Sequence, residues 1–333
     1  MGLTPESLGR LTVKDTETRF VVTGSMRLGG VEGSPGGAGM LTVGEGATLE
    51  VGDTLSVAEG SGIKMYEGTL SAATIDCDGM IESMSPQAHV TVSERLRFGP
   101  GASYNGAALT WTMTGSDFVN ESTSPDDLSA LHQATMVFVG GPLVTDSYEV
   151  AGRDLGYTSD GFGSDNFAMR DLRVGDHDTE GHLRLADLFD NSLQDAEPEP
   201  EALYVEQLSV SRGSTLDLNG LNLYVRNIPQ IDGEIIESGG AWWHVCDSGD
   251  FNGDGALNGL DIPDFKTALG DSANWIVATH RDADVIGDFN GDGVFNGLDI
   301  PGFKDALGGS TVPEPATVLL TITSLTAALK RRR

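Results

Sequence analysis

The sequence predicts a mainly β protein: a glycine-rich body of the β-solenoid type, like a right-handed β-helix, then a small α-helical module and a C-terminal hydrophobic helix. Three observations lead to this prediction. Short apolar–polar–apolar triplets alternate with glycine turns over most of the chain. A stretch of 13 residues, DFNGDGALNGLDI, is nearly repeated 38 residues later. An uncharged apolar segment and four basic residues close the chain.

The predicted body covers residues 1–240. Triplets such as Leu41/Val43, Leu49/Val51 and Leu55/Val57 place two apolar side chains on one face of a short strand, because strand side chains alternate. The triplets recur every six to nine residues between turns such as GEGA, where glycine tolerates a positive φ. Stacked coils of such strands form a solenoid. The alternative is a β-sandwich, whose strands are usually longer.

The second half of the body is less regular between residues 111 and 195, and the triplets return after residue 202. Asn219-Gly220 separates two apolar runs and predicts a hairpin or a tight corner. We therefore expect one all-β body, followed by a linker over residues 241–248.

Acidic residues outnumber basic ones by 50 to 20, which gives the 333-residue chain a formal net charge of −30. Such a charge repels nucleic acid and attracts cations, so no nucleic-acid partner is expected. The two cysteines, Cys77 and Cys246, lie far apart in the sequence. A disulfide between them would suit an exported protein, but two independent thiols are the favoured interpretation.

The duplicated stretch has the spacing of a calcium-binding loop, with oxygen ligands at positions 1, 3, 5, 7, 9 and 12 and glycine at position 6. Six or more hard oxygen donors suit Ca²⁺, whereas Mg²⁺ retains water in a tighter octahedron. We expect two calcium ions. Their predicted ligands are Asp250, Asn252, Asp254, the Ala256 carbonyl, Asn258 and Asp261 in the first copy, and Asp288, Asn290, Asp292, the Val294 carbonyl, Asn296 and Asp299 in the second.

A helix of about two turns is expected after each loop, because a proline, an apolar stripe and a stopping glycine follow. These residues are Ile262, Pro263, Phe265, Leu269 and Gly270 in the first copy, and Ile300, Pro301, Phe303, Leu307 and Gly308 in the second. A connecting helix is expected over residues 274–286, with Trp275, Ile276 and Val277 packed between the two halves. The net charge of −8 over residues 249–309 should oppose folding without metal.

This duplicated loop–helix unit resembles the type I dockerin module over residues 249–309, with 17 of 21 positions identical between its two copies. The resemblance implies a small helical module that two calcium ions order and that presents its helices to a cohesin-like partner. At loop positions 10 and 11, where the family often has Ser or Thr facing its partner, this chain has Gly259-Leu260 and Gly297-Leu298. The calcium ligands carry over, and a known cohesin specificity does not.

Residues 310–333 are interpreted as a sorting tail. Ala316–Leu329 has no charge but is shorter than the about 20 residues that a bilayer span needs. Val312-Pro313-Glu314-Pro315, this apolar stretch and the basic Lys330–Arg333 together resemble the PEP-CTERM sorting signal of exported bacterial proteins. The resemblance implies export, an exosortase-type sorting enzyme, transient membrane contact through residues 316–333, and a final place at the cell surface or in an extracellular matrix.

The N-terminal stretch MGLTPESLGRLTV lacks the basic and apolar regions of a signal peptide. Since export needs such a signal, we expect the true start of the protein to lie further upstream.

Catalytic constellations do not stand out. GDHDTEGH (175–182) brings His177, Asp178, Glu180 and His182 together in sequence, and a solvated polar turn is favoured over a metal site. Asp126-Asp127 and SDGFGSDN (159–166) are interpreted as surface rather than as the carboxylate pair of a glycosidase.

Two functional classes remain. The favoured one is a non-catalytic, calcium-binding surface or matrix protein with a β-body for structure or adhesion and a docking module. The alternative is a polysaccharide-degrading enzyme, either a glycoside hydrolase or a lyase, that carries a dockerin. A solenoid lyase would need Lys or Arg beside carboxylates in one outer groove, and the 16 basic residues outside the tail form no evident cluster in the sequence. An extracellular polysaccharide is a candidate partner in both classes.

Overall fold

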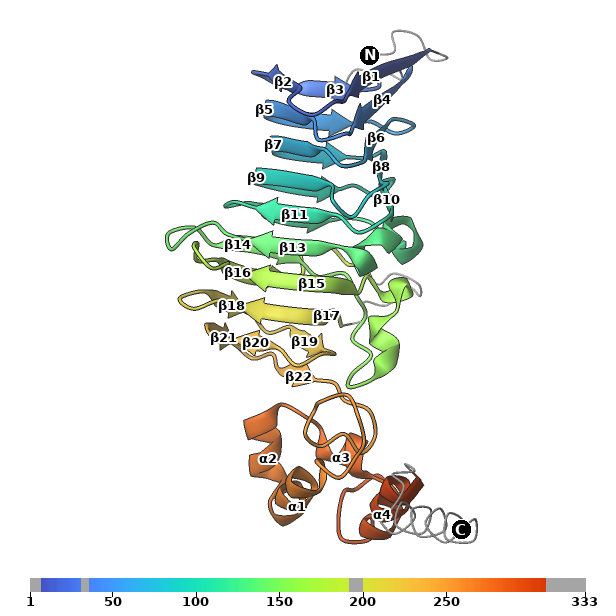
Figure 1. The fold of residues 1–333 in the computed structure, drawn as a ribbon, viewed down its shortest axis with the longest axis vertical. Coiled ribbons are helices and arrows are strands. Elements are labelled where there is room, and N and C mark those ends of the chain that lie inside the picture. Colours follow the sequence, from blue (N-terminus) through green and yellow to red (C-terminus); the bar gives the residue numbers. More distant parts are fainter. Residues whose placement is uncertain (1–6, 31–35, 192–199, 310–333) are drawn as a thin grey trace, which may run out of the picture. The chain divides into compact units, whose positions relative to one another are not determined.

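The computed structural model describes residues 7–30, 36–191 and 200–309 (Figure 1). The chain divides into two compact units, Met1–Val245 and Cys246–Arg333, which are taken separately below. The predicted sorting tail lies outside the described residues. None of the helices within the described ranges is long and apolar enough to cross a membrane.

In its described part, residues 7–30, 36–191 and 200–245, the first unit, the β-body, contains short strands and three 3-10 helices. The strands are β1 Leu8–Val13, β2 Arg19–Val22, β3 Met26–Leu28, β4 Ala38–Val43, β5 Thr48–Val57, β6 Gly62–Met65, β7 Thr69–Cys77, β8 Met80–Ser83, β9 His89–Phe98, β10 Ser103–Gly106, β11 Thr110–Met113, β12 Asp117–Asn120, β13 Thr135–Phe138, β14 Asp146–Glu149, β15 Met169–Val174, β16 His182–Ala186, β17 Ala202–Val210, β18 Thr215–Asp217, β19 Asn222–Val225, β20 Gln230–Ile231, β21 Glu234–Ile236 and β22 Trp242–His244. The 3-10 helices are η1 Pro125–Gln133, η2 Ser159–Phe162 and η3 Ser164–Asn166.

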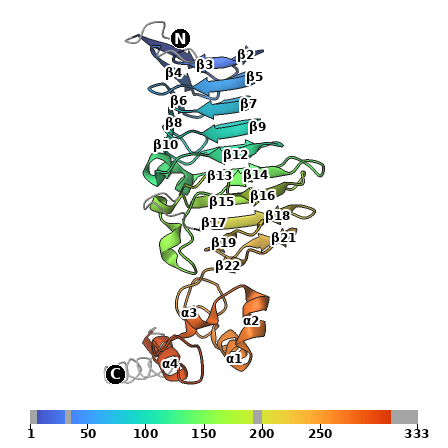
Figure 2. The same ribbon diagram turned by 180° about the vertical axis from the view of Figure 1, so that it is seen from behind.

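These strands pair in parallel, so each coil of chain returns beside the coil before it (Figures 1 and 2). One ladder runs through β5, β7, β9, β11, β13, β15 and β17. A second joins β1, β4, β6, β8 and β10. This curled parallel sheet is compatible with the predicted β-solenoid, whereas the sandwich alternative is built from antiparallel sheets.

The core of the β-body is a column of inward side chains from successive coils. In the first ladder, one apolar residue from each strand pairs with the next: Leu49, Leu70, Val90, Trp111, Met136, Leu172 and Leu208. All of them are buried, as the triplets predict. Each such side chain contributes about 1.5–3 kcal/mol through its removal from water.

Asn219 and Gly220 form a tight corner, with φ values of 52° and 88°. The strands on either side do not pair with each other: β18 pairs with β16 and β21, and β19 with β17 and β22. Of the two predictions for this dipeptide, the corner is therefore confirmed and the hairpin is wrong. Cys77 is buried, Cys246 is half-buried, and the two do not form a disulfide.

Over residues 246–309 the second unit contains four helices, α1 Ile262–Gly270, α2 Ser272–Thr279, α3 Ala283–Gly287 and α4 Ile300–Gly309. The single connecting helix predicted over residues 274–286 is wrong, because the segment forms α2 and α3. The left-handed backbone of His280 ends α2, and the Asp282 side chain caps α3 by accepting from the amides of Asp284 and Val285. Trp275 is buried as predicted, but Val277 is exposed.

The core of the second unit is aromatic and joins the two copies. Phe265 of α1 and Phe303 of α4 occupy equivalent positions, and their rings stack with centroids 3.9 Å apart. Phe251 is fully buried, and its ring contacts Phe265, Trp275, Phe295 and Phe303. The predicted apolar stripes begin only at these phenylalanines, since Ile262 and Ile300 are exposed.

Candidate metal loops and surface grooves

The two candidate metal loops, residues 250–261 and 288–299, have the same backbone form. Glycines at positions 4 and 6 of each loop take left-handed φ values: 74° and 85° at Gly253 and Gly255, and 76° and 84° at Gly291 and Gly293. L-residues with a side chain rarely adopt this conformation, so glycine lets the loop turn back on itself twice. The turn brings the six predicted ligand positions of each copy into one short loop.

Asp250 and Asp288 hold position 1 of the two loops with identical hydrogen bonds. One carboxylate oxygen accepts from the amides of positions 4 and 5, and the other accepts from the amide of position 6. The distances are 2.8, 3.1 and 2.9 Å in the first loop and 2.7, 3.1 and 2.7 Å in the second. The side chain at position 1 therefore organises the first half of each loop.

Asp261 and Asp299, at position 12, join the two ends of each loop. One oxygen of Asp261 accepts from the amide of position 3 at 3.0 Å, and the other accepts from the amide of position 9 at 2.7 Å. Asp299 repeats both bonds at 3.1 and 2.8 Å. Both side chains are fully buried. Aspartate, shorter than the usual glutamate, is thus held close to the loop backbone.

The neutral ligands take part in the same networks. The amide group of Asn252 donates to Asp254, and that of Asn258 donates to the Ala256 carbonyl, both at 2.9 Å. Asn290 and Asn296 make the equivalent bonds in the second loop at 3.1 Å. Within the described ranges, no group of three or more His, Cys, Asp or Glu side chains forms a metal site by itself. The candidate loops accordingly depend on asparagine and main-chain oxygens as well.

The electrostatics differ between the loops because their burial differs. Burial raises the pKa of Asp250, the Gly255 and Gly253 amides offset part of the effect, and the charges of Asp261 and Asp254 raise it further. The hydrogen bond from the Gly293 amide lowers the pKa of Asp288. A buried carboxylate beside others is costly unless a cation balances it. An all-oxygen donor set with this charge fits a hard cation such as Ca²⁺.

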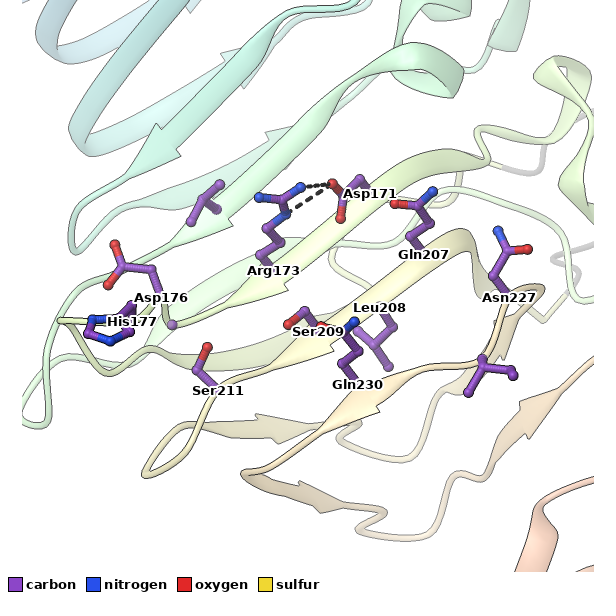
Figure 3. Close-up of a pocket in the computed structure, with 13 residues that line it drawn as sticks. Asp171, Arg173, Asp176, His177, Gln207, Leu208, Ser209, Ser211, Asn227 and Gln230 are labelled. Carbon is purple, nitrogen blue, oxygen red and sulfur yellow. Dashed lines mark hydrogen bonds and ion pairs between the residues drawn. The ribbon is translucent and has the colours of Figure 1, made fainter. Parts of the chain in front are cut away.

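A groove of about 520 Å³ lies on the outer face of the β-body (Figure 3). Its floor consists of outward side chains on the neighbouring strands β15, β17 and β20. Asp171 and Arg173 of β15 pair with Gln207 and Ser209 of β17. Ser209 pairs in turn with Gln230 of β20. Arg173 donates to Asp171 at 3.0 and 2.6 Å (Figure 3). Polar groups thus repeat along the groove at the strand spacing of about 4.8 Å.

A second groove of about 640 Å³ lies beside η2 and η3. It combines basic and acidic side chains, namely His132, Arg153, Arg226, Asp160, Asp165 and Glu206. Arg226 lies over the Phe162 ring at 5.5 Å and 3.9 Å from Glu206. Two aspartates of the predicted surface segment 159–166 therefore line a groove.

The other acidic segments are placed as follows. Asp126 and Asp127 lie exposed in the first turn of η1. In the segment 175–182, His177 contacts the neighbouring Asp178 at 2.7 Å, whereas His182 contacts Thr215 at 2.7 Å. The two histidines therefore contact different residues.

No protein-family model, curated protein or solved structure matches this chain.

Proposed function

We propose that the chain is an exported calcium-binding protein of the cell surface or extracellular matrix. Its dockerin-like module, residues 249–309, binds two calcium ions and docks a cohesin-like partner, while its right-handed β-helix-like body is non-catalytic. The observation that carries the proposal is the shared geometry of the two loops, in which all twelve predicted ligand positions recur with the same hydrogen bonds.

The exposed apolar residues next to the loops support docking. Leu260 and Ile262 in the first copy match Leu298 and Ile300 in the second, and all four are exposed, the leucines by 66% and 69%. Paired apolar side chains on a strongly acidic module favour a protein partner with an apolar face. This surface takes the place of the Ser/Thr pair that the dockerin resemblance leads one to expect.

Calorimetry with CaCl₂ tests the metal sites. Asp250→Ala together with Asp288→Ala should remove two ions per chain, because both position-1 carboxylates are lost. Asp264→Ala together with Asp305→Ala is the matched control, since it removes two acidic residues outside the loops and should leave the number of ions unchanged. Unchanged calcium binding in the first variant would contradict the site assignment.

Docking is tested by a pull-down of the full chain with Ca²⁺ or with EDTA. A cohesin-like partner should bind only with calcium. Leu260→Ser together with Leu298→Ser should keep both ions and lose that partner, and retention of the partner by this variant would refute the docking surface.

Sorting is tested by fractionation of producing cells. The full chain should reach the cell surface or matrix, whereas a chain without residues 312–333 should not be retained there. Equal distribution of the two chains would contradict sorting by an exosortase-type enzyme.

The second groove is the observation that favours the alternative function, because Arg153 and Arg226 line it together with Asp160, Asp165 and Glu206. This is the pairing of basic and acidic residues that a polysaccharide lyase requires. Incubation with acidic polysaccharides distinguishes the two functions. Chain cleavage that Arg153→Ala with Arg226→Ala abolishes would establish the enzyme, and binding without cleavage would support the non-catalytic body.

A further inference from the structure

Three buried polar side chains of the β-body lie outside the loops and grooves described above. Glu149, Asn191 and Glu201 are exposed by only 1%, 3% and 4%. Each has an oxygen without a hydrogen-bond partner, namely Oε2 of Glu149, Oδ1 of Asn191 and Oε2 of Glu201. Buried polar oxygens are nearly always satisfied in native proteins, so three in one region require an explanation.

The bonds of Asn191 fix the direction of its free oxygen. Its Nδ2 donates to the carbonyls of Asn120 and Ser122 at 3.0 and 2.7 Å. The amide orientation is therefore settled, and Oδ1 must point away from both carbonyls. The main-chain amide of Asn191 donates to Oε1 of Glu201 at 2.7 Å, which brings the carboxylate next to the asparagine.

Glu149 is fastened to the same segment. Its Oε1 accepts from the amides of Leu188 and Phe189, both at 2.7 Å. Main-chain amides of residues 188–191 thus donate to Oε1 of each glutamate. Oε2 of each carboxylate has no hydrogen-bond partner. β14 and β16 pair in register at Glu149 and Ala186, which places this segment directly beside Glu149.

The surroundings are acidic. The pKa of Glu201 is raised to about 8, mainly by burial and also by the charges of Asp187, Glu149 and Asp190, while the hydrogen bond from the Asn191 amide lowers it. Burial likewise raises the pKa of Glu149 to about 7, with Asp187 adding to the effect. Ionising both glutamates in this setting is costly, and a bound cation would offset that cost.

We propose that Glu149 Oε2, Glu201 Oε2 and Asn191 Oδ1 bind a divalent cation, calcium by preference, at a third site in the β-body. The donors are two carboxylates and one amide oxygen, with no nitrogen or sulfur, and this set selects a hard cation over zinc or copper. The site is separate from the dockerin-like loops in sequence and in compact unit. Its function is to fix the segment 188–191 against the coils at β12 and β14.

Calorimetry of the full chain with CaCl₂ separates this site from the loops. The wild type should bind three ions, and Asp250→Ala with Asp288→Ala should leave one. Adding Glu149→Gln and Glu201→Gln should remove the last ion, whereas adding Glu234→Gln, an exposed control on β21, should not. Glu149→Gln with Glu201→Gln in the otherwise wild-type chain should reduce the number of bound ions from three to two. This variant tests the third site even if the assignment of the two loops is wrong.

Thermal unfolding of the β-body gives a second readout. In the Asp250→Ala/Asp288→Ala chain, calcium should raise the unfolding midpoint relative to EDTA, and the Glu149→Gln/Glu201→Gln pair should abolish that rise. If that pair prevents folding, Glu149→Gln alone should weaken the remaining calcium site at least tenfold. The proposal is overturned if the Asp250→Ala/Asp288→Ala chain binds no calcium, or if the glutamine variants bind it with unchanged affinity.

Discussion

Asp261→Asn is the most direct perturbation of a candidate metal loop. The wild-type carboxylate uses one oxygen for the position-3 amide and the other for the position-9 amide, at 3.0 and 2.7 Å. Asparagine keeps one acceptor and presents an NH₂ group to the other amide. Because residue 261 is fully buried, water cannot replace the lost acceptor.

The magnitude follows from this single lost bond. A hydrogen bond to a charged group contributes about 1.5–3 kcal/mol. A loss of about 1.5–3 kcal/mol corresponds to a change of roughly 10- to 150-fold in the equilibrium between the closed and open loop. The substitution also removes a negatively charged ligand, so calcium binding at the first loop should be lost as well.

Amide hydrogen exchange in EDTA measures the loop equilibrium directly. Amides of residues 252–258 should exchange roughly 10- to 150-fold faster in Asp261→Asn, while those of residues 290–296 stay unchanged. Asp299→Asn should show the mirror result, and Asp264→Asn, three residues beyond the loop, should alter neither. Exchange in residues 252–258 that changes less than about threefold would refute the role given to this carboxylate.

Three further predictions concern buried groups. Burial raises the pKa of Asp146 from 3.8 to about 7, so its stabilising contribution is present below pH 4 and is lost as the pH rises through 7. In urea unfolding, Asp146→Asn should remove up to about 4 kcal/mol of the pH dependence of the free energy of unfolding. Wild-type and variant plots of this free energy against pH that run parallel would contradict the prediction. Burial raises the pKa of Cys77 to about 12, so a thiol reagent should modify only Cys246 in the native chain and both cysteines after denaturation. Phe265→Ala should destabilise the second unit by about 3–5 kcal/mol in calorimetric unfolding, since its ring stacks on Phe303, whereas Ile262→Ala, at an exposed position, should have little effect.

The inward face of the β-body could be predicted because the signal is local. Alternation within a triplet such as Leu49/Val51 decides which side chains are buried, whatever the strand pairs with. The pairing itself could not be predicted, because it depends on the length of each coil. The single helix expected over residues 274–286 failed for a local reason that propensity does not reveal, the left-handed His280.

The candidate sites divide in the same way. All ligands of a metal loop lie within 12 residues, so spacing alone predicts them. The groove at Asp171, Gln207 and Gln230 joins three strands, and the cluster of Glu149, Asn191 and Glu201 joins segments up to 52 residues apart. A periodic search for outward polar residues on the triplets would have found the groove, but no sequence pattern marks the cluster.

The unequal coils of the β-body have a consequence for how such a protein changes. Paired residues of the first ladder are 20 or 21 residues apart between Leu49 and Trp111, and 36 residues apart from Met136 to Leu172 and again to Leu208. The extra residues include η2 and η3, which border the second groove. The inward residues Met136, Leu172 and Leu208 nevertheless stay paired in register. Insertions at the corners of a coil can therefore create or reshape a recognition surface without a new core, and evolution can vary what this body contacts independently of what keeps it folded.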